Sequence, residues 1–314
     1  MFKRILVPLD GSQLAELALK HALHIARLYR SHIVLLSVIE ENQPGREDAV
    51  VDPLSWQISK SERELYLQSL ASQLVSDRVT TEHVVLEGRC AEGIVQYAQD
   101  ANTNLVVMTS HGRSGLSRWD ISSVTQKVVQ KLFLPVLVVR AYQPAEEVSY
   151  RRILVPLDGS KRAECSLPAS IALAEASHGS LLLASVVQRP ELPPAGPLEN
   201  ELREAASRLV QLTREALVPY LNDLKSRYSL PVDTLVLESD SVTRSIHELA
   251  DREEVDLVVM CAHGASGGAE YPFGSVASNY FQYGNKPVLI IQDIPPSLAR
   301  PTTVERVAEK YGKR

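Results

Sequence analysis

The sequence has few cysteines, few aromatic residues and no excess of positive charge. Its three cysteines, Cys90, Cys165 and Cys261, are far apart in a chain of 314 residues. They predict neither a disulfide framework nor a metal site, and they favour a reducing, cytoplasmic location. Aromatic residues make up 5% of the chain, and 33 basic against 38 acidic side chains leave a net charge of −5. Nucleic-acid binding needs a basic surface and stacking rings, so this composition argues against it.

Long apolar runs are also missing. No run approaches the ~20 residues that are needed to cross a bilayer. The first residues, MFKRILVPLDGS, turn polar too soon for a signal peptide. The sequence therefore predicts no membrane partner. Its 45% hydrophobic and 23% charged residues are ordinary values for globular domains. At roughly 100–200 residues per domain, the length predicts two domains.

Internal repetition is the strongest organisational signal in the sequence. Three blocks recur in the same order: RILVPLDGS at 4–12 and 152–160, LVVM with a following HG at 105–112 and 257–264, and PVLVV at 135–139, which returns as PVLII at 287–291. The first pair is offset by 148 residues and the other two by 152. A period this long indicates a duplicated domain, since solenoid repeats run about 20–50 residues.

The repeats predict the domain organisation. We expect one domain over residues 1–145, a second over 150–294, and a C-terminal tail over 295–314. In the tail, Thr302 and Glu305 form a capping-box pattern that predicts a short helix.

Each copy alternates short apolar runs with longer helical patterns. The runs are continuous and rich in β-branched residues, as in strands buried on both faces. In the first copy they are Ile5–Leu9, Ile33–Val38, His83–Leu86, Leu105–Met108 and Val136–Val139, and in the second they lie near Ile153, Leu181, Val232, Leu257 and Val288. The sequence thus predicts an α/β fold of two tandem doubly wound domains, each a five-stranded, mostly parallel sheet with flanking helices. Pro168 should kink or delay the first helix of the second copy.

An aspartate follows the first predicted strand of each copy. In an open parallel sheet, ligands bind beyond the carboxyl ends of the strands. The sequence PLDGS places Asp10 and Asp158 at that edge, where a carboxylate can accept hydrogen bonds from a ribose hydroxyl or a base amine. The alternative is that each aspartate, with the Gly and Ser after it, only forms the turn and caps the next helix.

The fourth predicted strand of each copy ends in a loop rich in glycine and serine. The loops begin MTSHGRSG at 108–115 and MCAHGASGG at 260–268, and nine residues after each HG come Ser122-Ser123 and Gly274-Ser275. Such a loop, leading into a helix N-terminus, presents unpaired N–H groups that suit a phosphate. Ser123 and Ser275 are predicted to be N-caps or phosphate donors, because both roles use the same geometry.

Together these motifs resemble those of the universal stress protein family, specifically its tandem two-domain members. The resemblance covers nearly the whole chain. It implies a Rossmann-like fold of the adenine nucleotide alpha hydrolase-like type. Family members form dimers through their last strands, so a tandem chain implies an internal pseudo-dimer with 135–139 and 287–291 as the contact strands. A further homodimer and an unknown protein partner are left open.

One branch of this family binds ATP through a motif of Gly, two residues, Gly, nine residues, then Gly and Ser or Thr. The corresponding residues are Thr109, Gly112, Ser122 and Ser123 in copy one, and Cys261, Gly264, Gly274 and Ser275 in copy two. Copy two is therefore closer to the motif. The loop charge favours copy one, which has Arg113 and Arg118 where copy two has Glu270. If the third glycine needs a positive φ, Ser122 costs about 1 kcal/mol.

The resemblance also implies site residues. On the base and ribose side they are Asp10, Val38 and Met108, with Asp158, Val186 and Met260 in copy two. On the phosphate side they are Gly112, Arg113, Ser122, Ser123 and Thr125, with Gly264, Gly274 and Ser275 in copy two. His111 and His263 are expected to orient the loops by hydrogen bonds rather than to act as bases. Cys261 is expected to be a small buried residue.

The sequence favours a stress-response sensor that binds ATP, ADP or AMP in at least one copy, with magnesium as a companion ion. Two alternatives remain. Departures from the motif and its loop, at Thr109, Ser122, Cys261 and Glu270, motivate an interaction protein that has lost nucleotide binding. The other is a slow ATP hydrolase or autophosphorylating protein, against which the sequence lacks GxxxxGK[ST], GxGxxG and an acidic cluster for catalytic magnesium.

Overall fold

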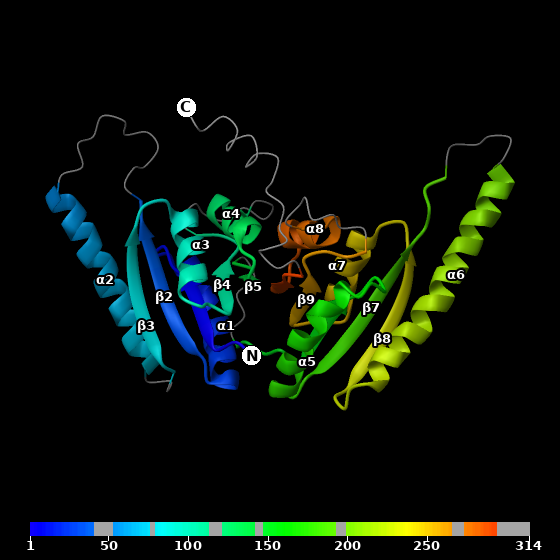
Figure 1. Ribbon diagram of the computed structural model, residues 1–314, viewed down its shortest axis with the longest axis horizontal. Helices are drawn as coiled ribbons and strands as arrows, with labels where there is room; N and C mark the ends of the chain where they lie inside the picture. Colours follow the sequence, from blue (N-terminus) through cyan, green and yellow to red (C-terminus); the bar gives the residue numbers. More distant parts are fainter. Residues whose placement is uncertain are drawn as a thin grey trace. The chain divides into compact units, whose positions relative to one another are not determined.

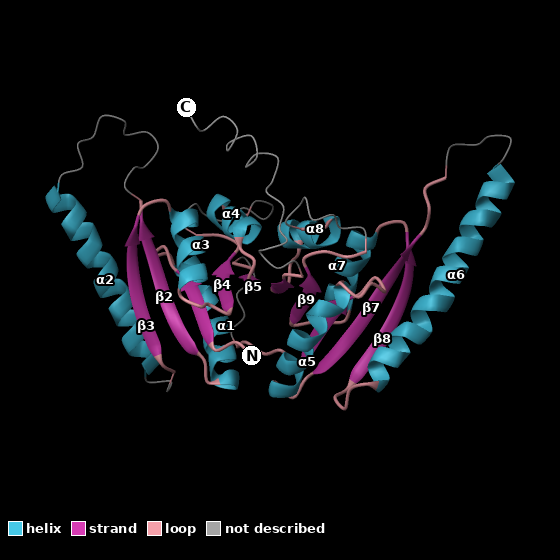
Figure 2. Cartoon of the chain, in the orientation of Figure 1, coloured by secondary structure: helices cyan, strands magenta, loops and turns pink. Residues whose placement is uncertain are grey.

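The computed structural model describes residues 1–40, 53–75, 79–112, 121–141, 147–192, 199–265 and 273–293. Its internal contacts divide the chain into two compact units, Met1–Ser149 and Tyr150–Arg314, which we call unit 1 and unit 2. Figures 1 and 2 show the helices and strands of both units. The predicted tail helix lies outside the described residues.

In the described part of unit 1, five parallel strands form a sheet in the order β3-β2-β1-β4-β5. The strands are β1 (Arg4–Pro8), β2 (His32–Ile39), β3 (Thr81–Glu87), β4 (Leu105–Thr109) and β5 (Val136–Val139). The chain runs outward from β1 through β2 to β3, then returns to β4 on the other side of β1. The strand order therefore reverses between β1 and β4, which is where open α/β sheets bind ligands.

The helices of unit 1 are α1 (Gln13–Tyr29), α2 (Pro53–Val75), α3 (Cys90–Asp100) and α4 (Ser123–Lys131). Right-handed crossovers place α1 and α2 on one face of the sheet and α3 and α4 on the other. The contacts agree, since α2 packs on β2 and β3 while α3 packs on α4 and β2. As predicted for the PLDGS turn, Ser12 caps α1, with its Oγ accepting from the N–H of Ala15 at 3.2 Å.

Unit 2 repeats this arrangement with the parallel order β8-β7-β6-β9-β10. Its strands are β6 (Arg152–Pro156), β7 (Ser180–Gln188), β8 (Val232–Ser239), β9 (Leu257–Cys261) and β10 (Val288–Ile291). Its helices are the 3₁₀ helix η1 (Ala163–Ser166), α5 (Leu167–Ala176), α6 (Glu199–Ser226), α7 (Val242–Arg252) and α8 (Ser275–Tyr283). The predicted effect of Pro168 is confirmed, because η1 precedes α5 and Pro168 lies in the first turn of α5.

Burial explains why the strand sequences do not alternate. Every residue of β4 and of β9 is buried, as expected for parallel strands that are covered by helices on both faces. The side chains of Ile5, Leu6 and Val7 in β1 are fully buried as well. Among the described helices, none combines the length and the apolarity needed to cross a bilayer.

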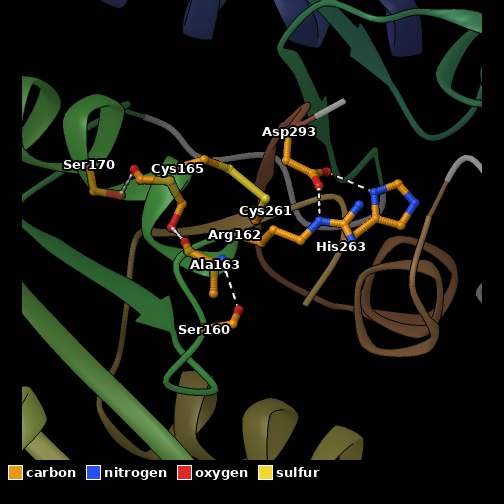
Figure 3. Close-up of a disulfide and its surroundings, with 9 residues drawn as sticks. Ser160, Arg162, Ala163, Cys165, Ser170, Cys261, His263 and Asp293 are labelled. Atoms are coloured by element: carbon orange, nitrogen blue, oxygen red, sulfur yellow. Dashed lines mark hydrogen bonds and ion pairs between the residues drawn. A yellow bond between two sulfur atoms is a disulfide. The ribbon is translucent and has the colours of Figure 1, made fainter. Parts of the chain in front are cut away.

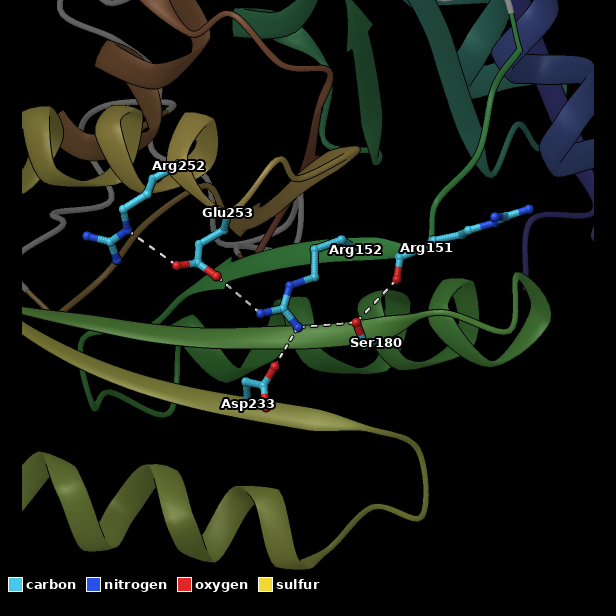
Figure 4. Close-up of polar contacts among 6 residues, drawn as sticks. All are labelled: Arg151, Arg152, Ser180, Asp233, Arg252 and Glu253. Carbon is cyan, nitrogen blue, oxygen red and sulfur yellow. Dashed lines mark hydrogen bonds and ion pairs between the residues drawn. The ribbon is translucent and has the colours of Figure 1, made fainter.

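The arginine that opens the repeated RILVP sequence anchors the amino end of each sheet. Arg152 donates to Asp233 at 2.6 Å, to Ser180 Oγ at 3.3 Å and to Glu253 at 3.4 Å (Figure 4). In unit 1, Arg4 pairs with Glu82 of β3. Because these arginines begin the strands and the PLDGS turn ends them, the arginines lie at the opposite edge of each sheet from Asp10 and Asp158. Their role is structural.

The prediction that the cysteines form no disulfide is wrong. Cys165 of η1 and Cys261 at the end of β9 form a disulfide, with Cα atoms 6.1 Å apart and a sequence separation of 96. The prediction relied on the separation of the cysteines along the chain. In the fold, η1, which contains Cys165, packs against β9, which ends at Cys261. Cys90 is a free, half-buried cysteine.

Candidate functional site

The turn after the first strand of each unit holds an aspartate at the point where the strand order reverses. Asp10 Oδ1 accepts hydrogen bonds from the Ser12 N–H at 2.9 Å and the Ser12 hydroxyl at 2.6 Å. Gly11 has a φ of 83°, a left-handed conformation that favours glycine. Unit 2 repeats the turn with Gly159 at a φ of 84° and with Asp158 Oδ1, which accepts from the Ser160 N–H at 3.0 Å. Each aspartate therefore builds the turn, as the structural alternative expected.

The glycine of each HG dipeptide lies directly against this aspartate. A Cβ atom on Gly112 would overlap Asp10 Oδ2, and one on Gly264 would overlap Asp158 Oδ2. In unit 2 the N–H of Ala265 donates to Asp158 Oδ2 at 2.6 Å. The carboxylate thus joins the segments that follow the first and fourth strands of the unit. At the position of Gly112 and Gly264, only glycine leaves room for the carboxylate.

Asp158 is held in its charged form. Burial acts to raise the pKa of Asp158, but hydrogen bonds from the Ser160 hydroxyl and from the N–H groups of Ala265 and Ser160 lower it below its ordinary value. The same hydrogen bonds hold the carboxylate in place at the point where the strand order reverses.

The four apolar candidates lie at or near the ends of the strands that flank this turn. Val38 and Val186 are half-buried near the ends of β2 and β7. Met108 and Met260 are buried near the ends of β4 and β9. Because β2 and β4 are the two neighbours of β1, the fold places Val38 and Met108 in the strands on either side of Asp10. The equivalent strands of unit 2 do the same for Val186 and Met260.

The N-terminus of α4 in unit 1 is capped by its own side chains. Ser122 is the N-cap residue, and its Oγ accepts from the Thr125 N–H at 3.1 Å. The two hydroxyls also bond to each other at 2.9 Å. Thr125 Oγ1 donates in turn to the carbonyl oxygen of Thr109 at 2.9 Å, which fixes the helix to the end of β4.

The N-terminus of α8 in unit 2 has no such cap. Its N-cap residue is Gly274, which has no side chain to cap the first turn. Ala277 stands where unit 1 has Thr125, so both capping hydroxyls are missing. The backbone is held in the same way in both units, since the N–H of Gly274 donates to Ala262 at 2.8 Å and that of Ser122 donates to Ser110 at 2.9 Å. Lacking a side-chain cap, the first N–H groups of α8 can serve an anion.

Two predictions about these helices are wrong. Ser123 and Ser275 are the first helical residues rather than the N-caps, which lie one residue earlier. The third glycine position of the motif also needs no positive φ, because φ is −56° at Ser122 and −69° at Gly274. The expected penalty for Ser122 therefore does not arise. Arg113, Arg118 and Glu270 lie outside the described residues, so the loop charge difference stays a prediction.

The histidines that precede the loop glycines have different partners in the two units. In unit 1, His111 Nδ1 lies 2.9 Å from Ser110 Oγ. In unit 2, His263 Nδ1 lies 2.7 Å from Asp293 Oδ1, and Asp293 Oδ2 accepts from Arg162 Nε at 2.7 Å (Figure 3). No local sequence pattern predicted a role for Arg162 or Asp293. Comparison of the two copies would have marked them, because unit 1 has Leu14 and Ala141 at these positions.

Replacing Asp293 by asparagine is expected to lower the melting temperature at neutral pH by several degrees, and the difference should vanish in acid. Burial acts to raise the pKa of Asp293, but the hydrogen bond and charge of His263, with those of Arg162, lower it. A carboxylate whose folded pKa is lowered stabilises the fold above its unfolded pKa of about 4, and this stability is lost as the pH falls through the folded pKa. Thermal unfolding of both proteins from pH 7 to pH 3 measures this. A difference that did not shrink as the pH fell below the ordinary aspartate pKa of about 4 would contradict it.

Comparisons with known proteins establish the family. The sequence model of the universal stress protein family matches residues 1–140 and again residues 149–292. The chain belongs to the universal stress protein family. It is 30% identical over 155 residues to a universal stress protein of Methanocaldococcus jannaschii, with 45% of this chain and 96% of that protein covered. It is 25% identical over 298 residues to a universal stress protein of Mycolicibacterium smegmatis, with 92% of this chain and 96% of that protein covered.

A solved structure shows the same fold over both units. The crystal structure of a universal stress protein from Archaeoglobus fulgidus superposes with a TM-score of 0.68 at 18% identity, covering 93% of this chain and 98% of that one. The predicted family and the predicted fold of two tandem α/β domains are therefore confirmed.

Proposed function

We propose that this universal stress protein binds an adenine nucleotide, namely ATP, ADP or AMP, in at least one unit and acts as a stress-response sensor. The observation that carries the proposal is the convergence, in each unit, of three features where the strand order reverses. These are an aspartate, a glycine that lets backbone approach it, and a helix N-terminus. A ribose hydroxyl suits the carboxylate, a phosphate suits the helix N-terminus, and a purine suits the apolar side chains beside them.

The residues proposed to hold the nucleotide fall into two equivalent sets. On the base and ribose side they are Asp10, Val38 and Met108 in unit 1, and Asp158, Val186 and Met260 in unit 2. On the phosphate side they are Gly112, Arg113, Ser122, Ser123 and Thr125 in unit 1, and Gly264, Gly274 and Ser275 in unit 2. Magnesium would enter with the nucleotide phosphates, since among the described residues no group of three or more His, Cys, Asp or Glu side chains is placed to hold a metal ion.

Unit 2 is proposed as the tighter site. A phosphate at the N-terminus of α4 would compete with Ser122 for the N–H of Thr125, which Ser122 already binds. At the N-terminus of α8 a phosphate meets no such competition from the N-cap residue, because Gly274 has no side chain. A free energy difference of about 1 kcal/mol for one capping hydrogen bond corresponds to roughly fivefold in affinity.

Exchanging the two cap residues is expected to exchange the affinities. Gly274→Ser should cap α8, stabilise unit 2 by a few tenths of a kcal/mol and weaken its nucleotide affinity about fivefold. Ser122→Gly should do the reverse in unit 1. Calorimetric titration with ATP and thermal unfolding measure both effects. Ser278→Ala is the matched control, because Ser278 is exposed one turn further along α8. Unchanged affinity in both cap variants would contradict the proposed phosphate position.

A further experiment separates the proposal from its alternatives. The purified protein is denatured, any released small molecule is identified by mass spectrometry, and phosphate release from added ATP is followed over time. Bound nucleotide without steady phosphate release supports the sensor. Steady release would favour the slow hydrolase. Absence of both bound nucleotide and ATP binding would favour the interaction protein. The cytoplasmic location, the internal pseudo-dimer, a further homodimer and a protein partner stay predictions of the sequence.

A further inference from the structure

Unit 2 contains a cluster of reactive and charged side chains that unit 1 lacks. The cluster consists of Arg162, Cys165, Cys261, His263 and Asp293, and the repeat places Leu14, Leu17, Thr109, His111 and Ala141 at the equivalent positions of unit 1. Only the histidine is common to both. We call these five residues of unit 2 the cysteine cluster.

The disulfide of the cysteine cluster connects the two segments that form the proposed nucleotide site. Cys165 lies in η1, which follows the Asp158 turn, and Cys261 ends β9, three residues before Gly264 (Figure 3). Cys261 also occupies the first glycine position of the family's ATP motif. The same two segments are joined at Asp158, whose Oδ2 accepts from the Ala265 N–H. The disulfide and the hydrogen bond to Asp158 therefore add to the backbone hydrogen bonds that Ala262 forms with Ile291 and Gly274.

The polar side chains of the cluster attach the loop to the end of unit 2's last strand as well. Asp293 uses both carboxylate oxygens, one toward His263 and one toward Arg162, each at 2.7 Å. The side chains of His263 and Asp293 are only 2% and 3% exposed. This attachment does not depend on the cysteines, so we expect unit 2 to stay folded when the disulfide opens.

The two cysteines differ in accessibility. Cys261 is buried at 7% exposure, whereas Cys165 is half-buried. We therefore expect a thiol from solvent to attack the sulfur of Cys165 rather than that of Cys261. The thiolate of the reductant forms a bond to Cys165 Sγ. The S–S bond of the protein breaks, its electron pair stays on Cys261 Sγ, and this sulfur takes up a proton. A second thiol of the reductant then displaces Cys165, which also takes up a proton, so that two electrons and two protons are transferred in all.

We propose that Cys165 and Cys261 form a reversible redox site that controls the order of the loop at residues 261–265. Disulfides in reducing compartments are usually transient or redox-sensing, which fits an isolated pair of this kind. The oxidised loop is preorganised and loses less conformational entropy when it binds a ligand. The effect on binding rests on the proposed function. Reduction of the disulfide weakens the nucleotide affinity of unit 2 about three- to tenfold and leaves the affinity of unit 1 unchanged.

The first test is made on the full chain, oxidised with glutathione disulfide or reduced with dithiothreitol. Alkylation followed by mass spectrometry should count one free thiol, that of Cys90, in the oxidised protein and three in the reduced protein. Amide hydrogen exchange at residues 261–265 should be at least tenfold faster after reduction. The equivalent residues 109–112 of unit 1 should not respond. Three free thiols after oxidation, or equal exchange in both states, would overturn the redox site.

Variants separate the cysteine pair from other effects of the reductant. Cys165→Ser and Cys165→Ala should behave like reduced wild type in either buffer, and Cys90→Ser should respond to reduction as wild type does. ATP affinity is then titrated in both redox states in an Asp10→Ala background, which removes a proposed contact of unit 1. Equal, measurable affinity in the two states would overturn the coupling to binding. Absence of ATP binding in either state, in the otherwise wild-type chain as well as in the Asp10→Ala background, would overturn the proposed function alone, because the exchange result still decides the redox site.

Discussion

Replacing Gly264 by valine is expected to destabilise unit 2 by about 3 kcal/mol and to abolish nucleotide binding there. The new Cβ would overlap Asp158 Oδ2. The carboxylate cannot move away without breaking its hydrogen bonds to the N–H groups of Ala265 and Ser160, at 2.6 and 3.0 Å. One substitution therefore disrupts both the turn and the loop that the proposed site needs.

Thermal and urea unfolding measure the loss of stability, and ATP titration below the melting temperature measures the loss of binding. Gly274→Ala is the matched stability control. A Cβ at Gly274 would lie 3.5 Å from the Ala262 carbonyl oxygen, which is ordinary contact, and φ is already negative there. We expect its cost to stay below about 1 kcal/mol. If Gly264→Val unfolded like wild type, the close packing of Asp158 on this glycine would be wrong.

Replacing Asp158 by alanine is expected to weaken nucleotide binding in unit 2 by at least tenfold. The change removes the carboxylate proposed to accept the ribose hydroxyl, and hydrogen bonds to charged groups contribute about 1.5–3 kcal/mol. It also leaves the N–H groups of Ala265 and Ser160 without this acceptor. Asp158→Asn keeps an acceptor for the turn and loses the charge, so its affinity should lie between those of wild type and Asp158→Ala.

The matched variant in unit 1 is Asp10→Ala, since Asp10 forms the same turn. Calorimetry on both variants identifies the unit that binds more tightly, and we expect the larger loss from Asp158→Ala because α8 lacks the side-chain cap of α4. A larger loss from Asp10→Ala would reverse this ranking and favour the basic loop predicted for unit 1. Unchanged affinity in both variants would contradict the assignment of the aspartates.

Sequence patterns predicted the sheets because the strands are local and strongly apolar. The run at Leu105–Met108 needs only its own composition to indicate a strand buried on both faces, and the structure buries each of its residues. Because the motifs recur in the same order, the second copy was predicted to have the same strands and helices as the first. The carboxyl-end rule then placed Asp10 and Asp158 where the strand order reverses, in advance of any coordinates.

Features that depend on distant residues were not predictable in this way. The disulfide and the contact of His263 with Asp293 join segments 96 and 30 residues apart in sequence, and no local pattern marks them. Helix α2 was not singled out, because its apolar residues do not gather on one stripe and several, such as Leu54 and Leu65, are exposed. The N-caps were misplaced by one residue because consecutive Ser or Gly-Ser residues offer two candidates, and only the backbone angles choose between them.

The most direct test of the account is a calorimetric titration of the oxidised full chain with ATP. We predict saturable binding with at least one site per chain, and a loss of affinity of at least tenfold at the tighter site in Asp158→Ala. Absence of binding heat in wild type, together with no nucleotide released on denaturation, would contradict the account.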